Sequence, residues 1–314
     1  MIKNTIKAKA KELAIPATGI ARADSIEFIR EIPEFFKAHK AKTAIISLQN
    51  YSSTYIPIED GLYGIIAPFA RRNYYKELRK KQEKLAKFLK AEYGASCYIS
   101  SNGPIREKPL ACKAGLGSYG MNHIIASPEY GSNVIIGEII TDIDIEPDEP
   151  SPEFDRRCLE CGLCIKACPS KAIEYNSPIK RERCLQHLSQ NTETPPEFWP
   201  IWGKRFYGCS SCQDACPKNK KAIARQEEPE EMQEAGKVYL PDIIFLENTE
   251  LKELFKGRQM SAGWINPESL IKNALIILSQ SPEGMEFLYR FKEKGRETLK
   301  GYAELLIEYN KQKH

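Results

Sequence analysis

Two kinds of hydrophobic periodicity alternate along the first 150 residues and predict a layered domain of helices and strands. Apolar side chains recur at helical spacing in residues 2–14 and in Tyr74–Tyr93, the second a long amphipathic helix. Segments rich in β-branched and apolar residues predict strands at 43–48, 97–101 and 133–145. Elements that alternate in this way indicate an α/β arrangement for residues 1–150.

Two intervening stretches have weaker patterns. Ser25 has the chemistry of a helix N-cap, so we expect a helix from there to about His39, broken locally by Pro33. Residues 52–68 contain two prolines and two glycines, which predict a loop with turns.

The second half of the chain changes character after a proline-rich linker at 147–152. Residues 151–223 predict loops and short helices, with a core that is not made of side chains. Helices dominate from about residue 237, with one from Pro267 to Leu278 and a last one over 295–311. We therefore expect an α+β fold in three parts: an α/β domain at 1–150, a cysteine-rich domain at 151–225, and a short helical, HEAT-like region at 226–314.

Composition excludes some classes of protein. The 314 residues are 42% hydrophobic, but no apolar run is long enough to cross a membrane. The formal net charge of +4 is too small by itself to indicate nucleic-acid binding. The first fifteen residues do not have the pattern of a signal peptide, so we expect a cytoplasmic, reducing location.

Eight of the ten cysteines lie between positions 158 and 216 and carry the chemistry of the chain. The first four have the spacing C-x2-C-x2-C-x3-C-P, which is typical of ferredoxins with two [4Fe–4S] clusters. Two such clusters need eight thiolate ligands. The segment is therefore predicted to be ferredoxin-like, with these metal ligands: Cys158, Cys161, Cys164, Cys168, Cys184, Cys209, Cys212 and Cys216.

Zinc and disulfide bonds are the alternatives for these cysteines. Zinc sites use paired C-x2-C knuckles, often with histidine, and no histidine lies between Cys158 and Cys184. Disulfides are disfavoured in a reducing compartment. Both alternatives are weaker than the ferredoxin-like spacing.

The division of the ligands follows from the rule that the fourth cysteine of a ferredoxin motif serves the other cluster. One set is then Cys158, Cys161, Cys164 and Cys216. The other contains Cys168, Cys209 and Cys212 and lacks a ligand, because the second motif is one cysteine short. Cys184 supplies that ligand, or it is a buried apolar thiol.

A glycine loop, Gly115-Leu116-Gly117-Ser118-Tyr119-Gly120, matches the dinucleotide pattern G-x-G-x-x-G in letters only. That pattern requires a strand before the loop and a helix after it. Here the residues before the loop predict a helix and those after it an extended segment. The glycines indicate a sharp turn or a close approach of the backbone, such as to a flat cofactor.

Three stretches together resemble the epoxyqueuosine reductases, the cobalamin- and iron–sulfur-dependent enzymes of tRNA queuosine maturation. They are PIREKPLACKAGLGSYGMNH (104–123), GSNVIIGEIITDI (131–143) and the cysteine array at 158–219. The chain is more distantly similar to the reductive dehalogenases. The resemblance implies that the N-terminal domain binds cobalamin and that electrons pass through two clusters to cobalt. The residues it places at the corrin are Arg106, Gly115, Leu116, Gly117, Ser118, Gly120 and Asn122.

The resemblance also implies partners. They are a tRNA or another modified-nucleoside substrate and an electron donor such as ferredoxin or flavodoxin, with no membrane. The alternative function is an electron-transfer or reactivating protein that acts on a corrinoid partner.

The chain departs from the family at three polar positions. Ser101 stands where the family has its proton-donating aspartate, Tyr75 where it has a histidine, and Met121 where it has a lysine. A serine has no useful acidity near neutral pH. Either the substrate differs and another group such as Tyr75 donates the proton, or a rearranged pocket supplies the acid. Cys112, beside the glycine loop, is either a structural thiol or a site thiol.

Overall fold

The computed structural model describes residues 2–53, 56, 61–155, 158–223 and 234–312, and its contacts group the chain into two compact units. The first unit comprises residues 1–52, 74–163 and 215–226. The second comprises residues 53–73, 164–214 and 227–314. The predicted three-part division of the chain remains a prediction. No helix within the described ranges is both long enough and apolar enough to cross a bilayer.

The first unit is built on a four-stranded antiparallel sheet with the order β1-β2-β7-β4. The strands are β1 (Ala17–Arg22), β2 (Thr43–Asn50), β4 (Cys97–Ser100) and β7 (Val134–Thr141). Strands β2 and β7 are buried along almost their whole length, which explains why both are rich in apolar residues. The three strands predicted from the sequence are confirmed, and β1 was missed.

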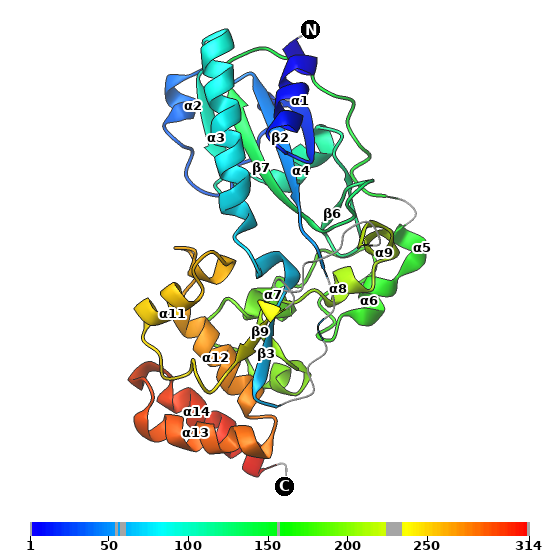
Figure 1. Cartoon of the computed structure of the whole chain (residues 1–314). Helices are drawn as coiled ribbons and strands as arrows, with labels where there is room; N and C mark the ends of the chain where they lie inside the picture. Colours follow the sequence, from blue (N-terminus) through cyan, green and yellow to red (C-terminus); the bar gives the residue numbers. More distant parts are fainter. Residues whose placement is uncertain (1, 54–55, 57–60, 156–157, 224–233, 313–314) are drawn as a thin grey trace. The chain divides into compact units, whose positions relative to one another are not determined.

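Helices cover both faces of this sheet (Figure 1). The helices α1 (Ile2–Glu12) and α3 (Tyr74–Tyr93) pack on one face, where Ile6, Leu85 and Leu89 join Ile45 and Ile139 in one core. Helix α4 (Glu107–Lys113) packs on the opposite face. The predicted helices at 2–14 and Tyr74–Tyr93 are therefore confirmed.

The prediction of a helix from Ser25 to about His39 is wrong. Only the 3₁₀ turn η1 (Ala23–Ser25) and the short helix α2 (Phe35–Ala38) form there. The chain between them is drawn into extended pairing, with a bridge from Phe28 to Ile105. Ser25 does not cap a helix, because its hydroxyl donates to the Arg22 carbonyl oxygen at 2.7 Å.

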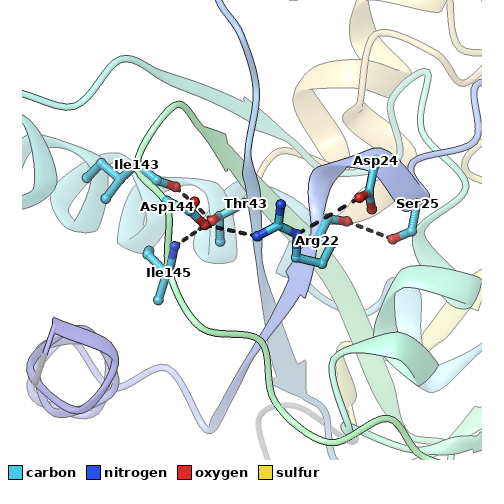
Figure 2. A network of polar contacts seen from close by, with 7 residues as sticks. All are labelled: Arg22, Asp24, Ser25, Thr43, Ile143, Asp144 and Ile145. Atoms are coloured by element: carbon cyan, nitrogen blue, oxygen red, sulfur yellow. Dashed lines mark hydrogen bonds and ion pairs between the residues drawn. The ribbon is translucent and has the colours of Figure 1, made fainter.

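Figure 2 shows the polar contacts at the edge of the sheet where β1 ends, β2 begins and the chain leaves β7. The Arg22 guanidinium donates to Asp144 at 2.9 Å, which joins β1 to the segment after β7. The Thr43 hydroxyl donates to the Ile143 carbonyl oxygen at 2.7 Å and accepts the Ile145 N–H at 3.1 Å. These bonds turn the chain away from the sheet directly after β7.

The second unit combines a small three-stranded sheet with helices that share one hydrophobic core. Strand β3 (Tyr63–Ile66) pairs with β8 (Arg205–Tyr207) and β9 (Lys237–Tyr239). Strand β3 corrects the prediction that 52–68 is all loop, although residues 54–55 and 57–60 of that stretch lie outside the described ranges. The other elements are α11 (Asn248–Leu254), α12 (Pro267–Leu278), α13 (Pro282–Lys294) and α14 (Glu297–Lys311).

The core of this unit reaches into the cysteine-rich segment. Trp202, Phe206 and Tyr207 are fully buried and pack with residues of α12, such as Leu275. The prediction that side chains contribute no core to 151–223 is therefore wrong for the stretch around β8. The predicted helix at Pro267–Leu278 is confirmed, and the predicted last helix begins at Glu297.

Candidate iron–sulfur centre and cofactor loop

The cysteine-rich segment consists of short helices and turns. Helices α5 (Cys158–Cys161), α6 (Leu163–Ala167), α7 (Leu185–Leu188), α8 (Ser211–Asp214) and α9 (Pro217–Ile223) each contain or directly adjoin a predicted ligand. No disulfide joins any of the ten cysteines, all of which lie within the described ranges. The segment therefore offers thiols rather than disulfides, as its pattern predicts.

Cys184 lies among the thiols of the second predicted ligand set. Burial raises the pKa of the Cys184 thiol, and the neighbouring Cys209 and Cys168 raise it further, while N–H groups of His187 and Gln186 lower it. The three cysteines come from separate segments: the turn after α6, the start of α7 and the turn after β8. The Cys184 thiol is thus close enough to Cys168 and Cys209 for their charges to affect it, and its ligation of a shared cluster remains a prediction.

The turn before Cys209 requires a glycine. Gly208 has a φ of +87°, and a Cβ there would lie 2.6 Å from the Cβ of Ala67. The N–H of Cys209 is held by the Gln186 side chain, whose Oε1 accepts it at 3.2 Å. Packing and a hydrogen bond therefore fix where this thiol leaves the backbone.

In the first unit, Cys158 and Cys216 are neighbours. Burial raises the pKa of the Cys158 thiol, and Asp155 and Cys216 raise it further. Lys218 and a hydrogen bond from the Met121 N–H lower it. The other two members of this predicted set are Cys161, in the same unit, and Cys164, in the second unit. Their ligation remains a prediction.

The Cys216 turn is clamped to the loop before β7. The buried Asn219 accepts the Ser132 N–H through Oδ1, at 2.6 Å, and donates its amide to the Ser132 hydroxyl at 2.8 Å. Gly131 has a φ of +60°, and a side chain there would collide with Asn219. An ion pair between Lys218 and Asp155 ties the same turn to the start of the cysteine array.

The glycine loop follows helix α4 and forms a hairpin of β5 (Ser118–Tyr119) and β6 (Ile125–Ala126). The helix before the loop and the extended segment after it are both confirmed, so the dinucleotide reading is excluded. The glycines allow other backbone segments to pass close to the loop. A Cβ on Gly115 would lie 2.5 Å from the Glu149 carbonyl oxygen, and one on Gly117 would lie 2.6 Å from that of Ala126.

The residues that the resemblance places at a corrin have different surroundings. Leu116 is buried in the core beneath α4, and Asn122 accepts the Ile124 N–H at 3.3 Å to close the hairpin. Arg106 is exposed and lies 3.5 Å from Glu27. Ser118 is half-buried and pairs with Ala126. The role of these residues at a cofactor remains a prediction.

Ser101 and Tyr75 lie on separate elements of the first unit. The Ser101 hydroxyl donates to Oε1 of the buried Gln82, on α3, at 3.2 Å. Gly137 on β7 leaves room for this pair, because a Cβ there would collide with both side chains. Tyr75 is half-buried in the first turn of α3, next to Tyr74, whose ring lies 5.7 Å from that of Tyr51.

Cys112 is a buried thiol on α4. Burial and the Glu153 carboxylate raise its pKa to about 11, so the thiol is protonated near neutral pH. This environment is typical of a structural cysteine rather than a reactive one.

A pair of carboxyl groups, of the buried Glu138 and the half-buried Glu107, lies on the other side of the sheet from Gln82 and was not anticipated. Glu138 on β7 is fully buried, opposite Ser100 on β4, and neither of its oxygens has a hydrogen-bond partner among the described residues. Glu107, at the start of α4, accepts the Asn102 N–H. An acidic residue within the apolar run of β7 is the sequence signal that could have revealed this pair.

The two carboxyl groups hold protons more tightly than ordinary glutamates. Burial and the neighbouring Glu107 raise the pKa of Glu138 well above its usual range. Burial raises the pKa of Glu107 to about 7, while the Asn102 N–H and Lys108 lower it. At least one proton is therefore held close to the loop that carries Ser101.

This raised pKa predicts a pH-dependent stability. The pKa of Glu107 is higher in the folded state than in the unfolded state. Its contribution to the unfolding free energy is therefore present at low pH and is lost as the pH rises through about 7. Between about pH 6 and about pH 8 the unfolding free energy of the parent is expected to fall because of Glu107. In the Glu107→Gln variant this fall is expected to be smaller by on the order of 1 kcal/mol. Urea denaturation at several pH values measures this difference.

A matched control is Glu34→Gln, which removes an exposed glutamate paired with Lys37. Its pH profile is expected to match the parent within a few tenths of a kcal/mol. A Glu107→Gln profile parallel to that of the parent would contradict the raised pKa.

We compared the chain with known protein families and known proteins. Residues 157–219 match the family model described as a 4Fe-4S double cluster binding domain. The epoxyqueuosine reductase of Bacillus subtilis (strain 168) is 32% identical over 229 residues, which cover 70% of this chain and 58% of that protein. The alignments span 58% and 62% of the first two curated relatives.

Solved structures share the fold. An epoxyqueuosine reductase from Bacillus subtilis, described with its catalytic aspartate loop swung out of the active site, superimposes with a TM-score of 0.82 at 26% identity, over 98% of this chain and 89% of that chain. An epoxyqueuosine reductase with an epoxyqueuosine-modified tRNA-Tyr stem loop has the same fold, with a TM-score of 0.79 at 24% identity over 99% of each chain.

The fold and the cysteine array define an iron–sulfur protein with two [4Fe–4S] clusters. The sequence similarity over most of the chain identifies it further, as a homologue of the epoxyqueuosine reductases. The predicted α+β fold and the predicted pair of clusters are both confirmed.

Proposed function

We propose that this protein is a cobalamin- and iron–sulfur-dependent reductase of the epoxyqueuosine reductase type, which acts on a modified nucleoside of tRNA. The observation that carries this proposal is the approach of the Met121 N–H, directly after the glycine loop, to the Cys158 thiol, whose pKa it lowers. It joins the proposed cofactor loop directly to a proposed cluster ligand. A cofactor on this loop would therefore lie beside a source of electrons.

The chain's own residues would hold these groups. Eight thiolates would bind the clusters, and the hairpin that follows Gly115 would support the corrin. When bound, the groups would supply low-potential single electrons and a reduced metal for the cleavage of a carbon–oxygen bond. The protein would position them, exclude water and deliver protons.

The source of the proton distinguishes this chain from its relatives. A solved relative is described with a catalytic aspartate loop, whereas Ser101 stands at the family's aspartate position in this chain. We propose Tyr75 as one donor, because a phenol can transfer a proton to a developing oxyanion. Glu107 is the acid that a rearranged pocket would use, because its raised pKa keeps it partly protonated at neutral pH and it binds the Asn102 N–H beside Ser101.

The proposed partners follow from the same relatives. A solved epoxyqueuosine reductase carries a modified tRNA stem loop, which supports a tRNA substrate for this chain. We propose a ferredoxin or flavodoxin as the electron donor, because the clusters need single electrons at low potential. A tRNA substrate is consistent with a cytoplasmic location.

Ser101 also favours a second candidate function. Without an acid at this position, the chain could pass electrons to the corrinoid of a partner protein rather than reduce a substrate itself. A tight complex with a corrinoid protein, without turnover of modified tRNA, would support this function.

Reconstitution tests the proposal. Protein purified without oxygen and incubated with cobalamin is expected to retain about one cobalamin per chain after gel filtration, as absorption spectroscopy would show. With a chemical reductant and tRNA that contains epoxyqueuosine, nucleoside mass spectrometry is expected to detect queuosine. Failure to retain cobalamin would contradict the enzyme proposal, whereas retention without turnover would favour the second candidate.

A further inference from the structure

Arg205 has an unusually complete set of partners beside the second ligand set. It opens β8, and its side chain is half-buried. Its Nη1 donates to the carbonyl oxygens of Trp202, at 2.6 Å, and Ile201, at 3.3 Å. Its Nη2 donates to the Ser211 hydroxyl at 2.9 Å, and its Nε donates to the sulfur of Cys209 at 3.3 Å. Every nitrogen of the guanidinium is therefore engaged.

These bonds fix the orientation of the guanidinium. The carbonyl groups of Ile201 and Trp202 belong to the turn that leads into β8, so the side chain folds back onto its own backbone. The indole N–H of the fully buried Trp202 donates to the Arg205 carbonyl oxygen at 2.9 Å. A planar guanidinium held by three oxygen acceptors presents its Nε–H to the sulfur in a single direction.

Cys209 and Cys168 differ in the kind of donor they receive. The Cys168 sulfur accepts the neutral Ala172 N–H at 3.3 Å. The Cys209 sulfur is bonded to a cation, and the Ser211 hydroxyl lies 3.5 Å from it. A hydrogen bond from a charged donor is about twice as strong as one between neutral groups.

A charged donor at a cluster ligand has a definite electrochemical consequence. Reduction of a [4Fe–4S] cluster adds one negative charge to the iron–sulfur core and its thiolates. Hydrogen bonds to the sulfurs and nearby charge set the reduction potential of such clusters. A fixed positive charge stabilises the reduced form more than the oxidised form, so it raises the potential.

We propose that Arg205 sets the reduction potential of the cluster that Cys209 binds, by directing its Nε–H and its charge at the Cys209 sulfur. Arg205 is thus a positioning residue that acts through a ligand. This inference rests on the double-cluster domain and does not depend on cobalamin or on any substrate. It can therefore fail while the proposed function stands, and the reverse also holds.

The test is a redox titration of the cluster-loaded protein, followed by electron paramagnetic resonance. In Arg205→Gln, the ratio of reduced to oxidised cluster at a fixed applied potential is expected to fall about tenfold for one of the two clusters. That change is about 59 mV for a one-electron couple. Arg205→Lys keeps the charge but loses the fixed Nε–H, so a smaller decrease in the same ratio is expected.

Arg183→Gln is the matched control. Arg183 is also half-exposed in the second unit, but its Nε donates to the Ser170 carbonyl oxygen, and it pairs with Glu197. Its removal is expected to change the ratio less than twofold. Equal shifts in Arg205→Gln and Arg183→Gln would overturn the proposal, because they would reflect charge alone.

Ser211→Ala keeps the test decisive if Arg205→Gln does not retain its clusters. It removes the hydroxyl that anchors Nη2 and lies beside the Cys209 sulfur, without changing any charge. A decrease in the ratio of about threefold is expected. Unchanged ratios in both Ser211→Ala and Arg205→Lys would overturn the proposal.

Discussion

Replacement of Cys184 with alanine is expected to lower the iron content from about eight to between about four and about seven atoms per chain. The lower value corresponds to loss of one whole cluster, and the higher value to a cluster that keeps three irons. The reason is that Cys184 lies among the thiols of the second ligand set, beside Cys168 and Cys209. Iron and sulfide analysis, with electron paramagnetic resonance of the oxidised protein, measures the change.

Cys97→Ala is the control for this experiment. Cys97 is a half-buried thiol on β4, outside the cysteine array, and burial raises its pKa. Its replacement is expected to leave the iron content and the spectrum unchanged. If Cys184→Ala also retained about eight irons and an unaltered spectrum, Cys184 would be a structural thiol, and the second cluster would need another ligand.

Introduction of an acid at position 101 is expected to have the largest effect on catalysis. If the parent protein reduces epoxyqueuosine slowly or not at all, Ser101→Asp is expected to raise the rate by about 10²–10⁴-fold, the usual contribution of a general acid. The neighbourhood could hold the new carboxylate. The Gln82 Nε2, which has no hydrogen-bond partner among the described residues, is adjacent and could donate to it.

Ser101→Asn separates acidity from shape. Asparagine matches aspartate in size but cannot donate a proton as an acid, so no gain in rate is expected. Nucleoside mass spectrometry of tRNA after a single turnover provides the measurement for both variants. A parent protein that already reduces epoxyqueuosine as fast as its relatives would show that the substrate has not diverged at Ser101.

The helices and strands that could be predicted from the sequence are the long ones with a regular pattern of buried residues. Strand β7 and helix α3 have long, regular apolar patterns, because β7 is buried along its whole length and α3 buries one face at regular spacing. The short strands β3, β8 and β9 have three or four residues each and pair across long stretches of chain. Such pairing leaves no local periodicity, so these strands could not be predicted.

Ser25 shows how a local signal can mislead. A serine before apolar residues is typical of an N-cap, but here the Phe28 backbone pairs with Ile105, which is far along the chain. Tertiary pairing overrides the local preference of the segment. The extended pairing leaves only the short helix α2.

The sequence predicts the metal ligands of the candidate site, and their ligation stays a prediction, whereas it does not predict the groups around them. Cysteine spacing alone grouped Cys184 with Cys168 and Cys209, because a cluster needs a fixed number of thiolates. The roles of Arg205 and Glu138 depend on neighbours from other segments, such as Cys209 and Glu107. A single charged residue in a sequence does not reveal which partner it meets in the fold.

The most direct test of the central claim is a metal analysis of protein purified without oxygen, together with Mössbauer spectroscopy of the iron. The account predicts about eight irons and about eight sulfides per chain, all in [4Fe–4S] clusters. Bound zinc, or iron for one cluster only, would contradict it.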